Sequence, residues 1–311
     1  MMADIFVKNE KVYKFKRITS NTLIYAFLIL VALAILIPFY WMILTSLKNE
    51  TQVLQIPPIL TLAPSEWKLS NYTALFVTVQ SGPRAGEMLF PFFNYMGNTV
   101  IISFITTIGT TITTILSAFA FSRLNFKGRD ALFAILLGTM MVPGEIFILT
   151  NFLTINKFGW YDIFNQSYSD AILAMTVPFL VSVFYIFYLR QTFKQIPNEL
   201  YFAAKVDGTS DFKYLLRIMI PVAMPTIVTI IILNSMGAWS AYMWPALVTA
   251  NDKYRLVSNG LRGAFTDTST GRVDYGQQMA AAVLVTLPLL VVFFTFRKQI
   301  MRGVSRSGIK G

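Results

Sequence analysis

The chain has 311 residues, of which 55% are hydrophobic, 15% aromatic and only 13% charged. This composition is typical of a polytopic membrane protein rather than a soluble domain. The sequence contains neither cysteine nor histidine, which excludes thiol nucleophiles, disulfide frameworks, zinc sites and histidine general bases.

Six apolar stretches are each long enough to cross a hydrocarbon core of about 30 Å, which takes about 20 residues of helix. Each should form an α-helix, because a spanning segment must satisfy its own backbone hydrogen bonds. The predicted fold class is an all-α, six-helix membrane domain at residues 22–296, between cytoplasmic segments at 1–21 and 297–311. The six stretches are 22–46, 96–121, 131–153, 170–190, 217–245 and 277–296.

Five basic residues precede the first stretch, as they do in a signal peptide. The apolar run at 22–46 is much longer than that of a cleavable signal peptide, and no small-residue cleavage site follows it. We therefore expect an uncleaved anchor. The loop at 47–95 is too short, and too much interrupted by Pro and Gly, to be an independent domain.

The positive charges predict the orientation of the spans. With the N-terminus inside, the four inner segments hold five, three, five and five Lys and Arg residues, and the outer segments hold eight. Both termini are then cytoplasmic. The net charge of +11 is explained as a topology signal, and it does not favour nucleic-acid binding because the basic residues are divided among short segments.

The inner loop at 191–216 is polar and lies between two long apolar stretches. Pro197 can open a helix, and Glu199 in the first turn suits the helix dipole. Leu200, Ala203 and Ala204 are three and four residues apart, which predicts a narrow face that a partner can approach closely.

A sharp turn is predicted after this helix. Gly208 can adopt the left-handed conformation that ends a helix, and Thr209 or Ser210 can cap the next one. The loop should therefore form a short helix, a turn and a second helix that continues into the fifth span. The alternative interpretation is an ordinary amphipathic helix at the membrane surface.

The spacing in this loop resembles the cytoplasmic EAA loop (E-A-A-x3-G-x9-I-x-L-P) of ABC importer permeases. Ala203-Ala204 are followed by three residues, Gly208, nine residues and Ile218-Met219-Ile220-Pro221. Phe202 stands where the family usually has Glu, and Ile220 where it has Leu. The resemblance implies that the residues that couple to an ATPase are Glu199, Phe202, Ala203, Ala204, Asp207 and Gly208.

The resemblance covers nearly the whole chain from about residue 25. It is similar to the carbohydrate-importer permeases with the type I ABC importer fold, and to their MalG-like subunit in particular. Further motifs that carry the resemblance are Asn98-Thr99, Ser117-Ala118-Phe119-Ala120-Phe121-Ser122-Arg123, Met140-Met141-Val142-Pro143 and Trp239-Ser240-Ala241-Tyr242-Met243-Trp244-Pro245.

This resemblance implies a bacterial inner-membrane protein that works with a second permease, two cytoplasmic ATPase subunits and an extracytoplasmic solute-binding protein. The sequence has no G-x-x-x-x-G-K-[ST] phosphate loop. We therefore expect that the chain is not an enzyme and holds no cofactor or metal of its own, and that the partner ATPase binds ATP and Mg.

The candidate solute path comprises Glu145, Trp239, Tyr242 and Trp244. Glu145 is the carboxylate predicted well inside a span, where a charge is costly and often functional. It could equally be a packing residue or a group at the outer boundary. The three aromatic residues could stack on sugar rings, or they could belong to the aromatic belt at the membrane interface.

The substrate class is left open between di- or oligosaccharides, acidic saccharides and glycerol phosphate. A secondary transporter would normally show internal repeats and several carboxylates at the membrane midplane, and one Glu is weak support for that class. A membrane-embedded enzyme would need a cluster of acids, a histidine or a metal set.

Overall fold

The structure is a computed structural model that describes residues 2–78, 88, 90–265 and 273–305. The described residues are mainly helical, and Thr78 and Met88 form an isolated β-bridge. The all-α prediction is therefore confirmed. The chain divides into two compact units, Met1–Leu75 with Phe265–Val283, and Phe76–Ala264 with Leu284–Gly311.

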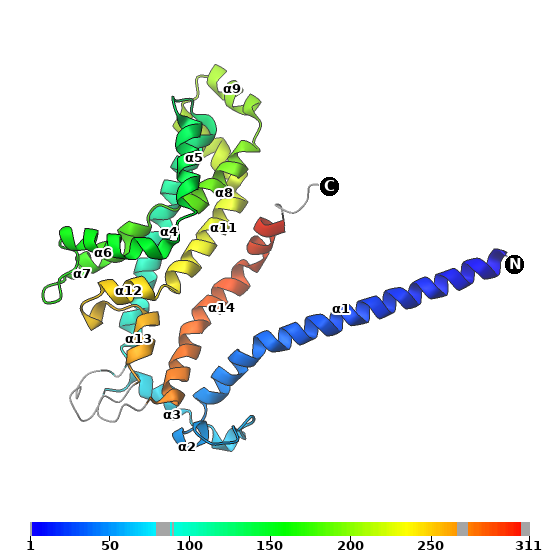
Figure 1. Ribbon diagram of the computed structural model, residues 1–311, viewed down its shortest axis with the longest axis vertical. Coiled ribbons are helices and arrows are strands. Elements are labelled where there is room, and N and C mark those ends of the chain that lie inside the picture. The colour runs from blue at the N-terminus through cyan, green and yellow to red at the C-terminus, as the bar shows by residue number, and fades with distance from the viewer. Residues whose placement is uncertain (1, 79–87, 89, 266–272, 306–311) are drawn as a thin grey trace. The chain divides into compact units, whose positions relative to one another are not determined.

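The first unit contains one long helix, α1 (Met2–Ser46), which includes the first predicted span and continues through the segment before it (Figure 1). Its apolar side chains are exposed over most of the span, as expected of a helix that faces lipid. Short helical segments follow: α2 (Glu50–Val53), η1 (Pro64–Glu66), α3 (Ser70–Thr73) and η2 (Ala74–Phe76).

The loop after α1 is held together by hydrogen bonds to buried polar side chains. The Asn71 amide donates to the carbonyls of Ser46 and Lys48, at 2.9 Å each. The ammonium of Lys48 donates to the Ile59 carbonyl at 2.6 Å, and burial lowers its pKa. These bonds satisfy backbone groups that no regular element pairs.

The second unit is built around α4 (Phe92–Arg123), which packs against both α8 (Val183–Lys194) and α11 (Ile220–Trp239) (Figure 1). Buried residues from all three helices form one apolar core, among them Ala118, Phe119, Leu189, Phe193 and Ile230. One end of this unit carries α9 (Asn198–Val206), and the other end carries α12 (Met243–Val248) and α13 (Val257–Gly263).

The third span was expected to be one helix, and this expectation is wrong. The segment is divided into α5 (Arg129–Thr139), the 3-10 turn η3 (Gly144–Ile146) and α6 (Phe147–Lys157), with a bend of 85°. Pro143 lies at the break. Proline lacks the N–H that an uninterrupted helix needs and disfavours helical geometry in the residue before it.

The fourth span is also broken, with a bend of 51° between α7 (Tyr168–Thr176) with η4 (Val177–Phe179) and α8. Pro178 is in η4, and it cannot bond the Ala174 carbonyl four residues earlier. That carbonyl instead accepts the indole N–H of Trp244 at 3.0 Å. Long-range contacts therefore stabilise the break.

Helix α4 satisfies the other carbonyls at this break. The Thr110 hydroxyl donates to the Phe179 carbonyl at 2.8 Å, and the Thr113 hydroxyl donates to that of Leu180. A Cβ on Gly109 would come within 2.4 Å of the Leu180 side chain, so the glycine permits this close approach. Irregular backbone inside a membrane domain is tolerated where neighbouring helices pair it in this way.

The fifth span begins with α10 (Asp211–Tyr214) and the π-helical turn η5 (Leu215–Met219), and α11 ends at Trp239 rather than at residue 245. The predicted span, 217–245, is therefore displaced by six residues toward the C-terminus but has the right length. A continuous helix could not use Pro245 as a donor, whereas Pro245 fits the first turn of α12, where no intrahelical donor is needed. The 3-10 turn η6 (Asp252–Tyr254) follows α12.

The sixth span is α14 (Tyr275–Ser305), so the predicted tail is helical as far as Ser305, and its last residues lie outside the described part. Within the part of the chain that the structure describes, four helices are long and apolar enough to cross a membrane, and the total rises to six if each bent pair is one span.

Candidate functional site

The loop between α8 and α10 has the predicted helix, turn and second helix. Helix α9 begins at Asn198, and Pro197 is its N-cap residue. The helix therefore begins one residue later than it would with Pro197 in its first turn. Gly208 has a φ of 69°, which lies in the left-handed region. Ser210, one of the two residues named as possible caps, accepts a hydrogen bond from the Lys213 amide.

The turn is a complete Schellman motif. The Gly208 amide donates to the Lys205 carbonyl at 3.0 Å, and the Thr209 amide donates to the Ala204 carbonyl at 2.8 Å. These two bonds satisfy carbonyls that the end of α9 would otherwise leave unpaired. The direction in which the chain leaves α9 therefore depends on the conformation of Gly208.

A second set of contacts crosses the turn from α9 to α10. The Asp211 carboxylate accepts hydrogen bonds at 2.7 Å from both the Lys205 ammonium and the Tyr201 hydroxyl. The carboxylate raises the pKa of Lys205, because it accepts a hydrogen bond from the ammonium and so stabilises the protonated form. Because both charged groups are well exposed, the ion pair orients the two helices more than it stabilises the fold.

The small-residue face that the sequence predicts is divided between two environments. Ala204 is buried in the chain's own core with Phe193 and Tyr214, so it does not belong to an accessible surface. Ala203 is exposed, and so is Phe202, with 63% of its surface accessible.

The outer face of α9 is therefore defined by residues three and four apart that are all exposed. Phe202 and Val206 are large apolar residues on this face, and Val206 is 88% exposed. Two other predicted loop residues, Asp207 and Gly208, are also exposed. The outer face of α9 is made of Glu199, Phe202, Ala203 and Val206.

The residues predicted for a solute path do not form one cluster. Glu145 lies in η3, at the break of the third span rather than within a continuous helix, and is exposed. Tyr242 is exposed between α11 and α12. Trp239 is half-buried, and its indole N–H has no hydrogen-bond partner among the described residues.

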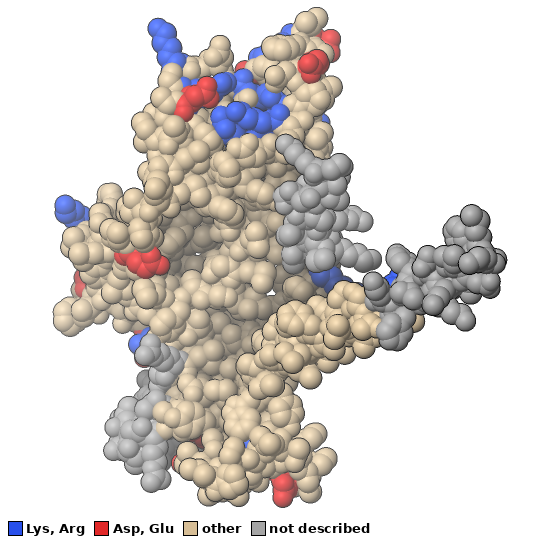
Figure 2. Space-filling view, turned by 45° about the vertical axis from the view of Figure 1, so that its right-hand side comes forward, with Lys and Arg blue, Asp and Glu red and all other residues tan. Residues whose placement is uncertain are grey.

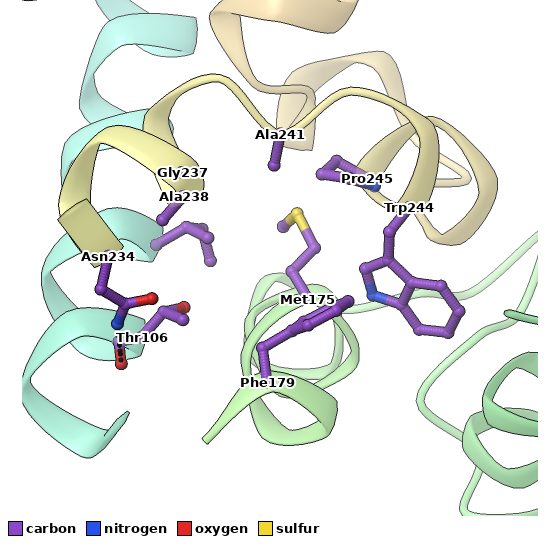
Figure 3. Close-up of a pocket in the computed structure, with 10 residues that line it drawn as sticks. Thr106, Met175, Phe179, Asn234, Gly237, Ala238, Ala241, Trp244 and Pro245 are labelled. Atoms are coloured by element: carbon purple, nitrogen blue, oxygen red, sulfur yellow. Dashed lines mark hydrogen bonds between the residues drawn. The ribbon is translucent and has the colours of Figure 1, made fainter. Parts of the chain in front are cut away.

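Trp244, in contrast, lines a pocket of about 200 Å³ between α4, α7, α11 and α12 (Figure 3). Its ring packs edge-on against that of Phe179, with centroids 5.8 Å apart. Asn234 and Thr106 line the other side of the pocket. An aromatic wall facing an amide and a hydroxyl suits a molecule that has both apolar faces and hydroxyl groups.

Sequence reasoning missed Phe179, Asn234 and Thr106 as pocket residues. Thr106 belongs to a row of buried Thr and Ser residues along α4, spaced three or four apart, which was a readable signal of a polar helix face. The break that places Phe179 in the pocket was not anticipated. Among the described residues, no cluster of Asp and Glu could hold a metal ion.

Most of the second unit and the last helix match a known protein family. Residues 111–306 match the family described as "Binding-protein-dependent transport system inner membrane component". The chain is 32% identical to the "Trehalose/maltose transport system permease protein MalG" of Thermococcus litoralis, over 91% of this chain and 94% of that protein. It is 27% identical to the "sn-glycerol-3-phosphate transport system permease protein UgpE" of Brucella suis, over 93% and 97%.

The fold also has a solved relative. The structure resembles a chain of a bacterial ABC transporter "involved in the import of the acidic polysaccharide alginate", with a TM-score of 0.72 at 20% identity. The match covers 88% of this chain and 93% of that one. At this identity the comparison concerns the fold alone.

Proposed function

This chain belongs to the family of inner-membrane components of binding-protein-dependent transport systems, and from that premise we propose that it is a permease subunit of an ATP-driven sugar importer. Family membership makes it a membrane permease rather than an enzyme. The proposed substrate is a di- or oligosaccharide. Glycerol phosphate and acidic saccharides are the alternatives, because relatives are named for such solutes.

One observation carries the proposed mechanism: a short helix, α9, presents an exposed apolar face beyond the end of the helical core. An exposed apolar patch rimmed by charged residues is typical of a protein interface. We propose that the ATPase binds the outer face of α9, and that ATP-driven closure of two ATPase subunits moves α9 and the helices joined to it. A second permease completes the transmembrane assembly.

ATP-driven uptake into proteoliposomes tests this function. The vesicles would contain this chain, its second permease and the ATPase, with the solute-binding protein outside and ATP inside. We expect uptake of trehalose or maltose, or of glycerol 3-phosphate or alginate oligosaccharides under the alternatives, and no uptake without the ATPase. Uptake driven by an ion gradient without the ATPase would instead support a secondary transporter.

We also propose that the chain is oriented in the membrane with both termini and α9 in the cytoplasm. Lys and Arg side chains gather at the end of the second unit that carries α9 (Figure 2). A surplus of basic residues favours the inner side of the membrane. The exposed basic residues of the loops at this end are Lys127, Lys194, Lys205, Lys213 and Arg217.

Reporter fusions check this topology. Fusions near residues 126, 205 and 308 are expected to report a cytoplasmic location, and those near 70 and 262 an external one, because the basic residues are concentrated in the proposed inner segments. A cytoplasmic signal at residue 262 would contradict the proposed arrangement of six spans.

The pocket beside Trp244 is proposed as part of the solute path. We expect Asn234→Ala to raise the KM for uptake about tenfold, because the variant lacks the side-chain amide that would hydrogen-bond a hydroxyl group of the solute. Asn165→Ala, in an exposed loop outside the pocket, is the matched control and should transport normally. An unchanged KM in Asn234→Ala, in a complex that assembles normally, would remove the pocket from the path.

A further inference from the structure

Two buried arginines lie at the ends of α4 and α8, next to the loop that carries α9. Arg123 is the last residue of α4 and is 9% exposed, and Arg190 lies in the last turns of α8 and is 5% exposed. Neither belongs to a predicted site. A buried guanidinium costs free energy for each N–H group that stays unpaired. The Arg123 Nε has no partner among the described residues, but both of its terminal nitrogens are paired.

Arg123 pairs with the joint that follows α8. One terminal nitrogen donates to the carbonyls of Phe193, at 2.7 Å, and Ile196. The other donates to the side-chain oxygen of Asn198, the first residue of α9, also at 2.7 Å. One side chain from α4 therefore holds both the end of α8 and the start of α9.

Arg190 makes the reciprocal connection to the joint that follows α4. Its Nε donates to the Phe121 carbonyl at 3.0 Å, and its guanidinium lies 3.7 Å from the ring centroid of Phe133 in α5. The Asp130 carboxylate, at the start of α5, is 3.5 Å away. Each helix thus supplies an arginine to the C-terminal carbonyls of the other.

This exchange agrees with the electrostatics of helix ends. The unpaired carbonyls at a helix C-terminus carry a partial negative charge and favour a nearby cation. The planar guanidinium can bond several acceptors in fixed directions, which a lysine ammonium on its flexible stem does less well. The contacts therefore restrict the angle between α8 and α9 as well as the distance between α4 and α8.

We propose that Arg123 and Arg190 form an arginine latch, which makes α9 and the adjoining ends of α4 and α8 move as one rigid lever. Arg123 is then a positioning residue. It contacts neither solute nor nucleotide, and it transmits the movement of α9 to α4. This inference rests on the proposed function, because a lever matters only if α9 is the part that is moved.

Hydrogen exchange tests the latch without requiring transport. In the full complex in nanodiscs, we expect Arg123→Gln to speed amide exchange in residues 198–206 about tenfold, since α9 loses its bond to α4. Arg123→Lys should resemble Arg123→Gln rather than the parent. Arg217→Gln removes an exposed arginine outside the latch and is the control that should exchange like the parent.

A transport measurement then separates positioning from stability alone. In proteoliposomes, Arg123→Gln should raise the number of ATP molecules hydrolysed per solute imported about tenfold, with ATPase assembly unchanged. Asn198→Ala removes the acceptor on α9 from an exposed position, so it should fold, and its effect should be in the same direction and non-additive with Arg123→Gln.

Each outcome decides between the proposals. Parent-like exchange in both Arg123→Lys and Asn198→Ala would overturn the latch, even if Arg123→Gln failed to fold. If Arg123→Gln speeds amide exchange but leaves the number of ATP molecules hydrolysed per solute imported unchanged, Arg123 only stabilises the fold. If the parent complex showed no ATP-driven uptake, the proposed function would fail, while the exchange data would still establish or refute the rigid connection.

Discussion

A Gly208→Val variant is expected to insert into the membrane like the parent and to lose most of its ATP-driven transport. Gly208 has a φ of 69°, and a β-branched residue is strongly disfavoured there. The left-handed conformation costs an L-residue about 1–2 kcal/mol, which reduces the population of the native turn about 5–30-fold. A Cβ at this position would meet no atom within 4 Å, so the effect comes from the backbone conformation.

Three variants serve as controls for the Gly208 prediction. Asn tolerates the left-handed region, so Gly208→Asn should retain most transport, and Gly208→Asp should lie between Asn and Val. Gly159 has a φ of 74° in the loop after α6, with equally open surroundings. Gly159→Val should therefore carry similar strain and keep its ATPase coupling. Normal transport by a well-expressed Gly208→Val variant would contradict the role of this turn.

The loop around Gly208 was predictable because its structure is set by nearby residues. A glycine after the last helical residue, a serine that caps the next helix and a lysine and aspartate across the turn all act within a few residues of one another. The orientation of the loop was less predictable. The spacing placed Ala204 on the same face as Ala203. In the structure, however, Ala204 is buried in the core with Phe193 and Tyr214.

The six apolar stretches were predictable from hydropathy, whereas the two breaks depend on both a local and a distant cause. Pro143 and Pro178 were local signals that a continuous helix would lose hydrogen bonds. The partners that make the fourth-span break stable, Thr110, Thr113 and Trp244, come from helices far away in the sequence. A reading of periodicity along one segment contains no information on such partners.

The solute path was the least predictable part. An intramembrane carboxylate and a run of aromatic residues are general signals, and they do not state which side chains share a cavity. Of the four residues predicted for the path, only Trp244 lines the pocket, because the chain breaks after α11 and the Trp244 indole in α12 points toward α7. Glu145 is displaced from the expected helix by the break at Pro143.

Replacing Phe202 by Glu is expected to weaken binding of the ATPase about 10–100-fold, although Glu is the residue usual in the family at this position. We propose that the ring enters an apolar socket of the ATPase. The alternative is that Phe202 rests against this chain's own cytoplasmic helices or against the lipid boundary. Its exposure of 63% opposes the first of these, and its ring contact is with the adjacent Tyr201, at 6.1 Å between centroids.

The energetic reason is the loss of apolar burial together with the cost of a new charge. Burying a Phe side chain contributes roughly 1.5–3 kcal/mol, which corresponds to the expected loss of affinity. A carboxylate in a socket shaped for a ring also stays unpaired and desolvated. In addition, it would lie three residues after Glu199 on the same face of α9, where like charges repel.

Phe212→Glu is the matched control, because Phe212 lies in the same loop, on α10, and is 61% exposed. Co-purification of the complex and solute-stimulated ATP hydrolysis should both fall in Phe202→Glu, fall much less in Phe212→Glu and stay near the parent values in Phe202→Leu. Leucine keeps most of the apolar area that the socket would bury. If Phe202→Glu assembles and couples as well as the parent, the socket does not exist, and this position of the loop tolerates either residue because it contacts no partner closely.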